Sequence, residues 1–401
     1  MPKKTIAQFN PSGLRVLIRC DFNVPVENGS ITDDRRIREA LPTIRSVIDR
    51  GGKAVCMSHL GRPEGAGFEA EHSLVPVAER LAKLLGKPVE FPSHDPTDAY
   101  AARAVTAMTN GSVLLLDNLR FAKGEKQGDA GFAATLAALG DAYVNDAFGT
   151  AHRQDASMYA LPLAMAGKPR LAGLLLEKEL RFLGEALRSP AKPFVVVLGG
   201  AKVSDKAPVI ENLLPKAEHI LVGGAMAYTF LRALGRKVGA SRIEDALLPA
   251  ARKILEQAAK LKAQLHLPQD HVCSTQFAEM GGHIDVCGED IKDGYMGLDI
   301  GPKTQAAYAQ VIAKARTIVW NGPMGVFEWM PFKVGTQMVA QAIARATQAG
   351  AVSIVGGGDS AAAVETFGLA EQVSHVSTGG GASLEMLAGR PFKSVELLDN
   401  A

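Results

Sequence analysis

Short apolar runs alternate with amphipathic segments along the chain. In the first half, four runs predict strands: Arg15–Phe22, Ala54–Ser58, Ser112–Asp117 and Ala142–Asn145. The segment Asp34–Asp49 predicts an amphipathic helix, because its apolar residues recur at helical spacing: Ile37, Leu41, Ile44 and Ile48. This alternation is typical of an α/β fold, in which helices cover both faces of a mainly parallel sheet.

In the second half, five apolar runs each end in glycine: Phe194–Gly200, His219–Gly224, Thr317–Pro323, Ala351–Ser360 and His375–Gly381. Most of them predict a buried strand followed by a helix. Glycine at that junction lets backbone N–H groups approach a ligand closely, and a helix N-terminus favours an anion. Several such turns on one sheet indicate a phosphate-bearing ligand at the carboxyl ends of the strands.

The middle of the chain carries a boundary. Residues Leu174–Leu187 have leucines on one helical stripe, and the following Ser189–Pro193 contains two prolines that end a helix. We therefore predict two Rossmann-like domains, each a mainly parallel sheet with helices on both faces. They are residues 1–173 and 194–385, joined by an interdomain helix and hinge over 174–193.

Composition narrows the class of protein. The 401 residues suit two domains, and 47% apolar with 21% charged residues is ordinary for a globular protein. A net charge of +2 gives no argument for nucleic acid or an anionic membrane. No apolar run is long enough for a membrane span, and the four cysteines form no CxxC pair. We predict a cytoplasmic protein with no nucleic-acid or membrane partner.

Two lysines follow the first glycine turn of the second half. Lys202 and Lys206 are four residues apart, and we expect Pro208 in the first turn of the helix they open. Both ammonium groups near the positive end of a helix would neutralise phosphate oxygens. The alternative is a pair of solvated surface lysines, which is the usual state of lysine. Their position directly after Leu-Gly-Gly favours the phosphate interpretation.

The turn Gly356–Ala361 loosely matches a dinucleotide fingerprint. We reject that interpretation, because the acidic residue, Asp359, lies inside the turn and not about 20 residues further on. Asp359 fits a magnesium partner and a helix N-cap equally well. The chain has neither a GxxxxGK[ST] sequence nor the protein-kinase motifs, so a nucleotide site would be of another design.

The strand ends of the first half offer polar and basic groups. In an extended segment, Arg19, Asp21 and Asn23 face one way. Other basic residues follow further strands or open the first helix: Arg36, His59, Arg62, Arg120 and Arg153. Each arginine alone is compatible with a surface position, and His59 fits a structural histidine equally well. Together at one sheet edge, the arginines favour a small ligand that carries phosphate and carboxylate.

The ordered motifs of the chain resemble phosphoglycerate kinase over essentially its whole length. The matching segments are Arg19–Pro25, Ser58–Pro63, Leu116–Phe121, Asn145–Arg153, Leu198–Lys206, Gly297–Pro302, Trp320–Glu328, Gly356–Ser360 and Ser377–Ser383. The resemblance implies that this chain is a glycolytic transferase. It also implies a monomer. Its reaction is reversible transfer of a phosphoryl group from 1,3-bisphosphoglycerate to ADP, giving 3-phosphoglycerate and ATP with Mg²⁺, in line after domain closure.

The resemblance also implies roles for individual residues. The first domain, with residues 386–401 packed back on it, would bind the glycerate substrate through Asp21, Asn23, Arg36, His59, Arg62, Arg120 and Arg153. The second would bind the nucleotide through Gly199, Gly200, Lys202, Lys206, Gly223, Gly224, Gly297, Asn321, Glu328, Gly357, Gly358, Asp359 and Ser360, with Asp359 as the Mg²⁺ partner.

Within those sets, the resemblance implies finer assignments. Asp21 and Asn23 would bind the C2–C1 end of the glycerate, and the 3-phosphate would be held by His59, Arg62, Arg120 and Arg153. Glu328 would hold the ribose, and the base pocket would be lined by Gly223, Gly224 and Gly297. Arg36 and Lys202 would act on the transferring phosphoryl from opposite domains. The attacking β-phosphate oxygen of ADP is already ionised, so we assign no general base.

One segment departs from the family pattern. After Arg153, relatives commonly carry Ala-His, whereas this chain has Gln154 and Asp155. Asp155 adds a negative charge beside the expected phosphate site, and this bears on substrate affinity. Two other functions compete with the kinase: a phosphometabolite-binding regulator without catalysis, and a different acyl-phosphate kinase. The complete set of arginines and lysines speaks against both.

Overall fold

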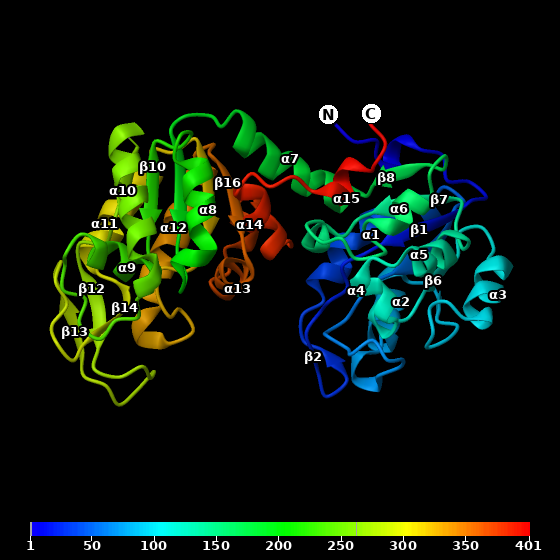
Figure 1. The fold of residues 1–401 in the computed structure, drawn as a ribbon, viewed down its shortest axis with the longest axis horizontal. Coiled ribbons are helices and arrows are strands. Elements are labelled where there is room, and N and C mark those ends of the chain that lie inside the picture. Colours follow the sequence, from blue (N-terminus) through cyan, green and yellow to red (C-terminus); the bar gives the residue numbers. More distant parts are fainter. Residues whose placement is uncertain (1, 262) are drawn as a thin grey trace. The chain divides into compact units, whose positions relative to one another are not determined.

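The computed structural model describes residues 2–261 and 263–401. Contacts between Cα atoms divide the chain into two compact units. Unit 1 runs to Arg181 and includes Pro391–Ala401, and unit 2 is Phe182–Arg390. Each unit contains a parallel six-stranded sheet flanked by helices (Figure 1), which confirms the predicted fold class.

The sheet of unit 1 has the strand order β5-β6-β4-β1-β7-β8. Its strands are β1 (Arg15–Arg19), β4 (Lys53–Met57), β5 (Val89–Glu90), β6 (Val113–Leu115), β7 (Ala142–Asn145) and β8 (Arg170–Ala172). The helices are α1 (Arg35–Ile48), α2 (Val75–Leu85), α3 (Ala99–Ala107), α4 (Lys123–Gln127), α5 (Ala130–Ala137), α6 (Ala160–Ala164) and α15 (Lys393–Glu396), and β2 (Val26–Glu27) pairs with β3 (Ser30–Ile31).

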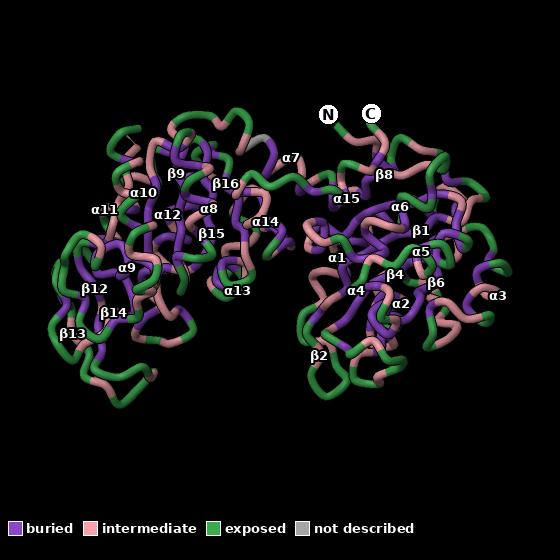
Figure 2. The backbone as a smooth tube through the Cα atoms, in the orientation of Figure 1, coloured by how far each residue is buried: buried purple, intermediate pink, exposed green. Residues whose placement is uncertain are grey.

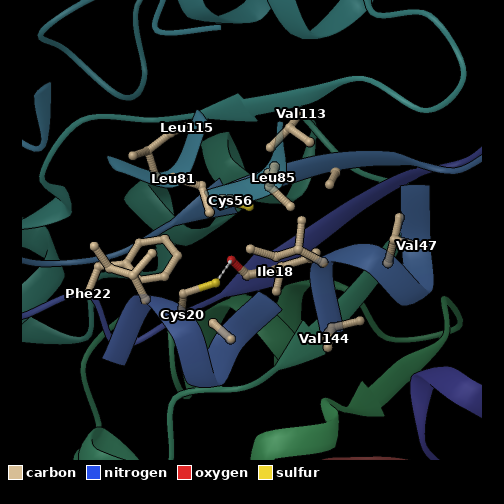
Figure 3. Close-up of a cluster of buried hydrophobic side chains, with 14 of the residues drawn as sticks. Ile18, Cys20, Phe22, Val47, Cys56, Leu81, Leu85, Val113, Leu115 and Val144 are labelled. Atoms are coloured by element: carbon tan, nitrogen blue, oxygen red, sulfur yellow. Dashed lines mark hydrogen bonds between the residues drawn. The ribbon is translucent and has the colours of Figure 1, made fainter. Parts of the chain in front are cut away.

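The core of unit 1 fixes the direction of the residues that follow β1. Cys20 and Phe22 are fully buried against strand and helix residues such as Cys56, Leu81 and Val144 (Figure 3). Burial of a large apolar side chain stabilises the fold by roughly 1.5–3 kcal/mol. Because neighbouring residues of an extended segment point to opposite sides, Asp21 and Asn23 are turned away from this core. The strand itself ends at Arg19, three residues before the predicted end.

The sheet of unit 2 has the order β11-β10-β9-β15-β16-β17. Its strands are β9 (Phe194–Leu198), β10 (His219–Val222), β11 (Gln264–His266), β15 (Thr317–Asn321), β16 (Val352–Gly356) and β17 (His375–Val376). A second, antiparallel sheet has the order β13-β12-β14, formed by β12 (His271–Ser274), β13 (Ile284–Cys287) and β14 (Met296–Ile300). The five glycine-terminated runs of the sequence therefore each contain a strand of the larger sheet.

The helices of unit 2 are α8 (Val203–Leu213), α9 (Met226–Ala233), α10 (Leu248–Leu261), α11 (Pro302–Ile312), α12 (Val334–Gln348), α13 (Gly358–Thr366) and α14 (Gly381–Leu387). The predicted interdomain helix is α7 (Leu174–Arg188), which runs across the division between the units. Every residue of β9 and β15 is buried (Figure 2), as expected for central strands of a sheet covered on both faces. In the part of the chain that the structure describes, no helix has the length and apolar character of a membrane span.

Candidate active site

The carboxyl ends of four neighbouring strands line one pocket of unit 2. Its volume is about 340 Å³. Residues from the ends of β9, β15, β16 and β17 contribute to it, among them Gly199, Gly200, Lys202, Lys206, Asn321, Gly357, Gly358, Asp359, Ser360, Gly380 and Gly381. The structure therefore brings together the predicted phosphate-binding glycines and both lysines at the sheet edge where open α/β sheets bind ligands. We call this the glycine pocket.

Glycine is required at two points of this pocket. Gly200 has φ +100° and Gly357 has φ +90°, in the region that residues with a side chain rarely adopt. A Cβ at Gly200 would meet no atom within 4 Å, so the backbone there borders open space. Gly357 is also the N-cap of α13, which directs the first N–H groups of that helix toward its N-terminal end. These features suit a bound anion.

Lys206 is a buried ammonium group within the glycine pocket. It lies in α8, and its Nζ donates to Oδ1 of Asn321 at the end of β15. Burial lowers the pKa of Lys206 to about 8, although the negative charges of Asp205 and Asp359 oppose that shift. Nδ2 of Asn321 is buried and has no hydrogen-bond partner in the part of the chain that the structure describes. A buried donor without an acceptor costs about 1–3 kcal/mol, and an anion in the pocket would satisfy it.

The acidic residue of the pocket is exposed and begins a helix. Asp359 is the second residue of α13, whose N-cap is Gly357, so the alternative assignment of Asp359 as an N-cap is wrong. No hydrogen bond or ion pair engages its carboxylate within the described residues. The hydroxyl of Ser360 accepts from the N–H of Gly322 (2.6 Å) and so anchors the β15 turn.

The first lysine of the pair lies at the very start of its helix. Lys202 is exposed and is the N-cap residue of α8, at the positive end of the helix dipole. The sequence predicts Pro208 in the first turn of this helix, and that prediction is wrong, because Pro208 lies inside α8. The helix therefore begins earlier than the proline suggested, and Lys206 becomes a helical residue whose side chain is buried.

A second pocket adjoins the first, because both are lined by Gly200 and Ala201. Its volume is about 450 Å³, and its lining is largely apolar: Gly224, Ala225, Ala240, Phe277, Met296, Gly297, Leu298, Pro323 and Val326, with Arg242 and the exposed Glu328 as charged members. An apolar pocket with few polar groups, next to an anion-binding turn, suits a nucleoside that carries phosphates. We call it the apolar pocket.

Of the glycines predicted for the base pocket, Gly297 lines the apolar pocket and Gly223 does not. Gly297 lines the apolar pocket, and a Cβ there would collide with the side chain of Tyr228. Gly223 is not among the lining residues, since it packs against Met324, whereas its neighbour Gly224 does line the pocket. Sequence reasoning missed Phe277, whose ring lies 4.8 Å from that of Trp329. It sits in a loop without a recognisable motif, so only the fold reveals it.

In unit 1, an aspartate that follows β1 forms an ion pair with an arginine at the start of α1. Oδ2 of Asp21 lies 2.8 Å from Nη1 of Arg36, the second residue of α1. Asp21 is buried, and its Oδ1 has no hydrogen-bond partner among the described residues. Oδ1 of Asn23 accepts from the N–H of Gly61 (2.8 Å) and ties this segment to the loop after β4. The residues predicted for one end of the substrate are thus near one another.

A basic cluster surrounds His59 at the same sheet edge. Burial holds the pKa of His59 well below its usual range, and the charges of four arginines lower it further: Arg19, Arg120, Arg153 and Arg36. The ring is therefore neutral, and Nδ1 lies 3.3 Å from Nη2 of Arg19. Because that guanidinium is a donor, Nδ1 acts as the acceptor and Nε2 carries the proton. Sequence reasoning had not assigned Arg19 this supporting position.

The arginines of the cluster differ in how they are held. Nη1 of Arg120 donates to the carbonyl of Gly61 (2.9 Å), and Nη2 lies 3.5 Å from Oδ2 of Asp155. Arg153 is half-buried, and Arg62 is exposed. Neither guanidinium has a hydrogen-bonded or ion-paired partner in residues 2–261 and 263–401. The charges of Arg36, Arg120 and Arg153 therefore act on His59, whereas Arg62 is not among the charges that shift its pKa in the described part of the chain.

Comparison with known proteins identifies the family. The family model described as phosphoglycerate kinase matches residues 6–390. Phosphoglycerate kinases of Rhodopirellula baltica and Thermosipho africanus are 54% and 51% identical to this chain, over 100% of it and over 100% and 98% of their own lengths. The phosphoglycerate kinase structure from Coxiella burnetii matches with a TM-score of 0.88 and 42% identity, covering 99% of this chain and 98% of its own.

A more distant structure agrees. Phosphoglycerate kinase from Pyrococcus horikoshii matches with a TM-score of 0.84 at 32% identity, over 98% of both chains. Similarity therefore extends through both units, the glycine and apolar pockets of unit 2 and the basic cluster of unit 1 included. On its sequence and on its fold, this chain belongs to the phosphoglycerate kinase family.

Proposed function

We propose that unit 1 binds 3-phosphoglycerate or 1,3-bisphosphoglycerate and that unit 2 binds MgADP or MgATP. The reaction of the family is reversible phosphoryl transfer from 1,3-bisphosphoglycerate to ADP, so the chain is a phosphotransferase. The observation that carries our assignment is the different chemistry of the two sites. Unit 2 offers glycine turns, an ammonium group and an apolar pocket, whereas unit 1 offers guanidinium groups around a neutral histidine.

In unit 1, Arg120 and Arg153 are the principal ligands of the 3-phosphate in this proposal. Guanidinium groups match phosphate in bidentate fashion, and Nε of Arg120 is a buried donor without a partner in residues 2–261 and 263–401. Neutral His59 adds a donor through Nε2. Arg36, held by Asp21, serves the C1 end, where the phosphoryl group is transferred. Arg62 remains a candidate that would have to move toward the ligand.

In unit 2, the nucleoside occupies the apolar pocket and the phosphates occupy the glycine pocket. Lys206 and Asn321 bind phosphate oxygens, and Glu328 binds the ribose. Magnesium fits beside Asp359, because this exposed carboxylate has no partner among the described residues and stands among N–H groups that suit an anion. Mg²⁺ is commonly held by one carboxylate together with substrate phosphates. When bound, it would neutralise charge on those phosphates.

Catalysis in this proposal consists of positioning and charge neutralisation. The attacking phosphate oxygen is ionised, so the chain supplies no base. Arg36 and Lys202 neutralise the charge on the phosphoryl group during transfer. The two ligands are assigned to different units, so we expect the segment 174–193 to act as a hinge, with water excluded on closure. We further propose a monomer in the cytoplasm.

A coupled assay with 3-phosphoglycerate and MgATP tests this function. We expect turnover with 3-phosphoglycerate and none with glycerate or acetate, because both controls lack the 3-phosphate. Turnover with acetate would indicate a different acyl-phosphate kinase. Ligand binding without any turnover would indicate a regulatory protein.

The Asp359→Asn variant tests the magnesium assignment. We expect the Mg²⁺ concentration for half-maximal activity to rise about tenfold, because the variant lacks the carboxylate charge that partners the cation. The measurement is a Mg²⁺ titration of kcat at saturating substrates. Asp205→Asn is the matched control, since Asp205 lines the same pocket and has no assigned role toward the metal. A shift in the control alone would contradict the assignment.

The buried ammonium of Lys206 predicts proton uptake. Its pKa in the free protein is about 8, and phosphate oxygens next to it will raise that pKa. At pH 9 the free ammonium is largely deprotonated, so MgADP binding should take up a proton, and affinity should fall as the pH rises above 8. Calorimetry in two buffers of different ionisation enthalpy measures this uptake. Lys206→Arg, which stays charged, should abolish it, and equal uptake in both proteins would refute the assignment.

A further inference from the structure

A buried carboxylate already occupies part of the basic cluster. Oδ2 of Asp155 lies 3.5 Å from Nη2 of Arg120, and these two side chains are only 11% and 8% exposed. No other hydrogen bond or ion pair engages the Asp155 carboxylate within the described residues. The carboxylate therefore has a single protein partner, and that partner is one of the arginines assigned to the substrate phosphate.

The backbone fixes Asp155 in this position. Its carbonyl accepts from the N–H groups of Met158 and Tyr159, both at 2.9 Å. Arg153, two residues earlier, belongs to the same loop after the 3₁₀ segment Phe148–Thr150. The carboxylate is thus held beside the cluster by the loop that supplies one of its arginines, and a ligand at Arg153 and Arg120 would lie next to it.

The charges around Asp155 are of both signs. Burial lowers the pKa of Arg120. The negative charge of Asp155 raises that pKa, whereas the positive charges of Arg153 and Arg19 lower it further. Glu125 is a second buried carboxylate nearby. Burial raises its pKa, Asp155 adds to that shift, and Arg19 and Ser157 oppose it. Ser157 also donates to both oxygens of Glu125, so Glu125 is satisfied independently of Arg120.

The pair with Arg120 is long for a charge-assisted hydrogen bond. Such bonds usually measure about 2.7–2.9 Å, and the Asp21–Arg36 pair of the same unit measures 2.8 Å. The Asp155 contact at 3.5 Å is also a single one, whereas a guanidinium can bind an anion through two parallel N–H groups. Nε of Arg120 has no hydrogen-bond partner within the described part of the chain. A phosphate can therefore offer Arg120 better geometry than Asp155 does.

We propose that Asp155 is an affinity-determining residue, an internal anion that competes with the substrate 3-phosphate for Arg120. This inference rests on the phosphate site proposed above. In the free protein, Asp155 neutralises part of the cluster. In the complex, it stands beside a dianion and repels it. Asp155 thus weakens the binding of 3-phosphoglycerate and favours its release, while the nucleotide site is unaffected.

The opposite role is positioning: Asp155 would orient Arg120 for the phosphate, and its loss would weaken binding. The two roles predict opposite signs for Asp155→Asn, which keeps the shape of the side chain and removes its charge. If Asp155 competes with the ligand, we expect Asp155→Asn to bind 3-phosphoglycerate about tenfold more tightly than the unchanged protein. The reason is that a like charge beside a bound ligand repels it and lowers its affinity. KM for 3-phosphoglycerate should fall, without an increase in kcat.

The experiment is calorimetric titration of 3-phosphoglycerate, and separately of MgADP, into the full chain and into the variants Asp155→Asn, Asp141→Asn and Arg153→Ala. Asp155→Asn should tighten 3-phosphoglycerate and leave MgADP unchanged. Asp141→Asn is the matched control, because it also removes one carboxylate charge that pairs with an arginine, here Arg15 at 2.7 Å. Asp141 directly precedes β7. This control should change neither affinity. Asp155→Ser serves as a second variant if Asp155→Asn does not fold.

Arg153→Ala separates failure of this inference from failure of the proposed site. If Arg153→Ala binds 3-phosphoglycerate normally, the phosphate site itself is wrong. If Arg153→Ala weakens binding while Asp155→Asn leaves it unchanged or weaker, the site stands and competition by Asp155 is overturned. Equal tightening in Asp141→Asn would also overturn it, because the effect would then reflect only net charge.

Discussion

Replacing Lys202 by alanine is expected to lower kcat by about a hundred- to a thousandfold, the usual cost of removing a group that stabilises charge in a transition state. Lys202 lies at the positive end of α8 and lines the glycine pocket. It is exposed, and its ammonium group makes no hydrogen bond or ion pair within the described residues, so its loss should not affect folding. MgADP affinity should change only a few-fold, because Lys206 and the glycine turns remain.

The matched control for this variant is Lys314→Ala. Lys314 is an exposed lysine of unit 2 that precedes β15, whereas the glycine pocket lies beyond the other end of that strand. Steady-state assays with both substrates saturating measure kcat, and calorimetry measures MgADP affinity. A Lys202→Ala enzyme with near-normal kcat, or a loss as large in Lys314→Ala, would contradict the role of Lys202.

Arg36→Ala is expected to lower kcat by about a hundredfold or more while sparing MgADP binding. Its side chain is only 31% exposed, and its guanidinium is held by Asp21 at 2.8 Å, which suits the role proposed for it at the C1 end of the substrate. Nucleotide affinity should be unchanged, because the glycine and apolar pockets are lined by residues of unit 2. Arg36→Lys keeps the charge without the planar fork, so we expect partial activity.

A neighbouring arginine of α1 provides the control. Arg38 is exposed and pairs with Asp34 at 3.2 Å, and Arg38→Ala should retain full kcat. Thermal unfolding of each variant checks that the loss of Arg36, which leaves buried Asp21 without its ion pair, has not simply unfolded unit 1. Equal losses of kcat and of MgADP affinity in Arg36→Ala would point to a structural role instead.

Much of the fold could be predicted from the sequence, because buried parallel strands leave a strong pattern. Ala142–Asn145 and the helix from Leu174 were placed within one residue. The end of β1 was missed because Cys20 and Phe22 remain buried beyond the last ladder pair, Arg19 with Met57. The start of α8 could not be predicted from Pro208, since packing within the unit tolerates a proline inside that helix.

The residues of the candidate site were predictable in kind but not in their partners. Glycines and lysines after strands indicated phosphate, yet nothing in the sequence connects Lys206 with Asn321, 115 positions away. The same holds for Asp155 and Arg120, which pair across 35 positions. Phe277 escaped notice because a loop aromatic has no periodic context. Such pairings depend on which strands are neighbours in the sheet, and single-sequence patterns do not specify strand order.

The two proposed phosphate sites differ in the groups that would hold the ligand. Unit 1 offers guanidinium groups of fixed charge around a histidine that burial keeps neutral. Unit 2 offers backbone N–H groups and a lysine whose pKa burial has lowered to about 8. We therefore expect affinity for the nucleotide, more than affinity for 3-phosphoglycerate, to change with pH above 8.

The central claim is that this chain binds its two phosphorylated ligands at separate sites. Calorimetric titration of MgADP into protein saturated with 3-phosphoglycerate tests it most directly. We predict that one MgADP still binds per chain, with an affinity within about 150-fold of that in the free protein, since coupling between sites typically changes affinity by about 5–150-fold. Mutual exclusion of the two ligands, seen as loss of MgADP binding at saturating 3-phosphoglycerate, would contradict the account.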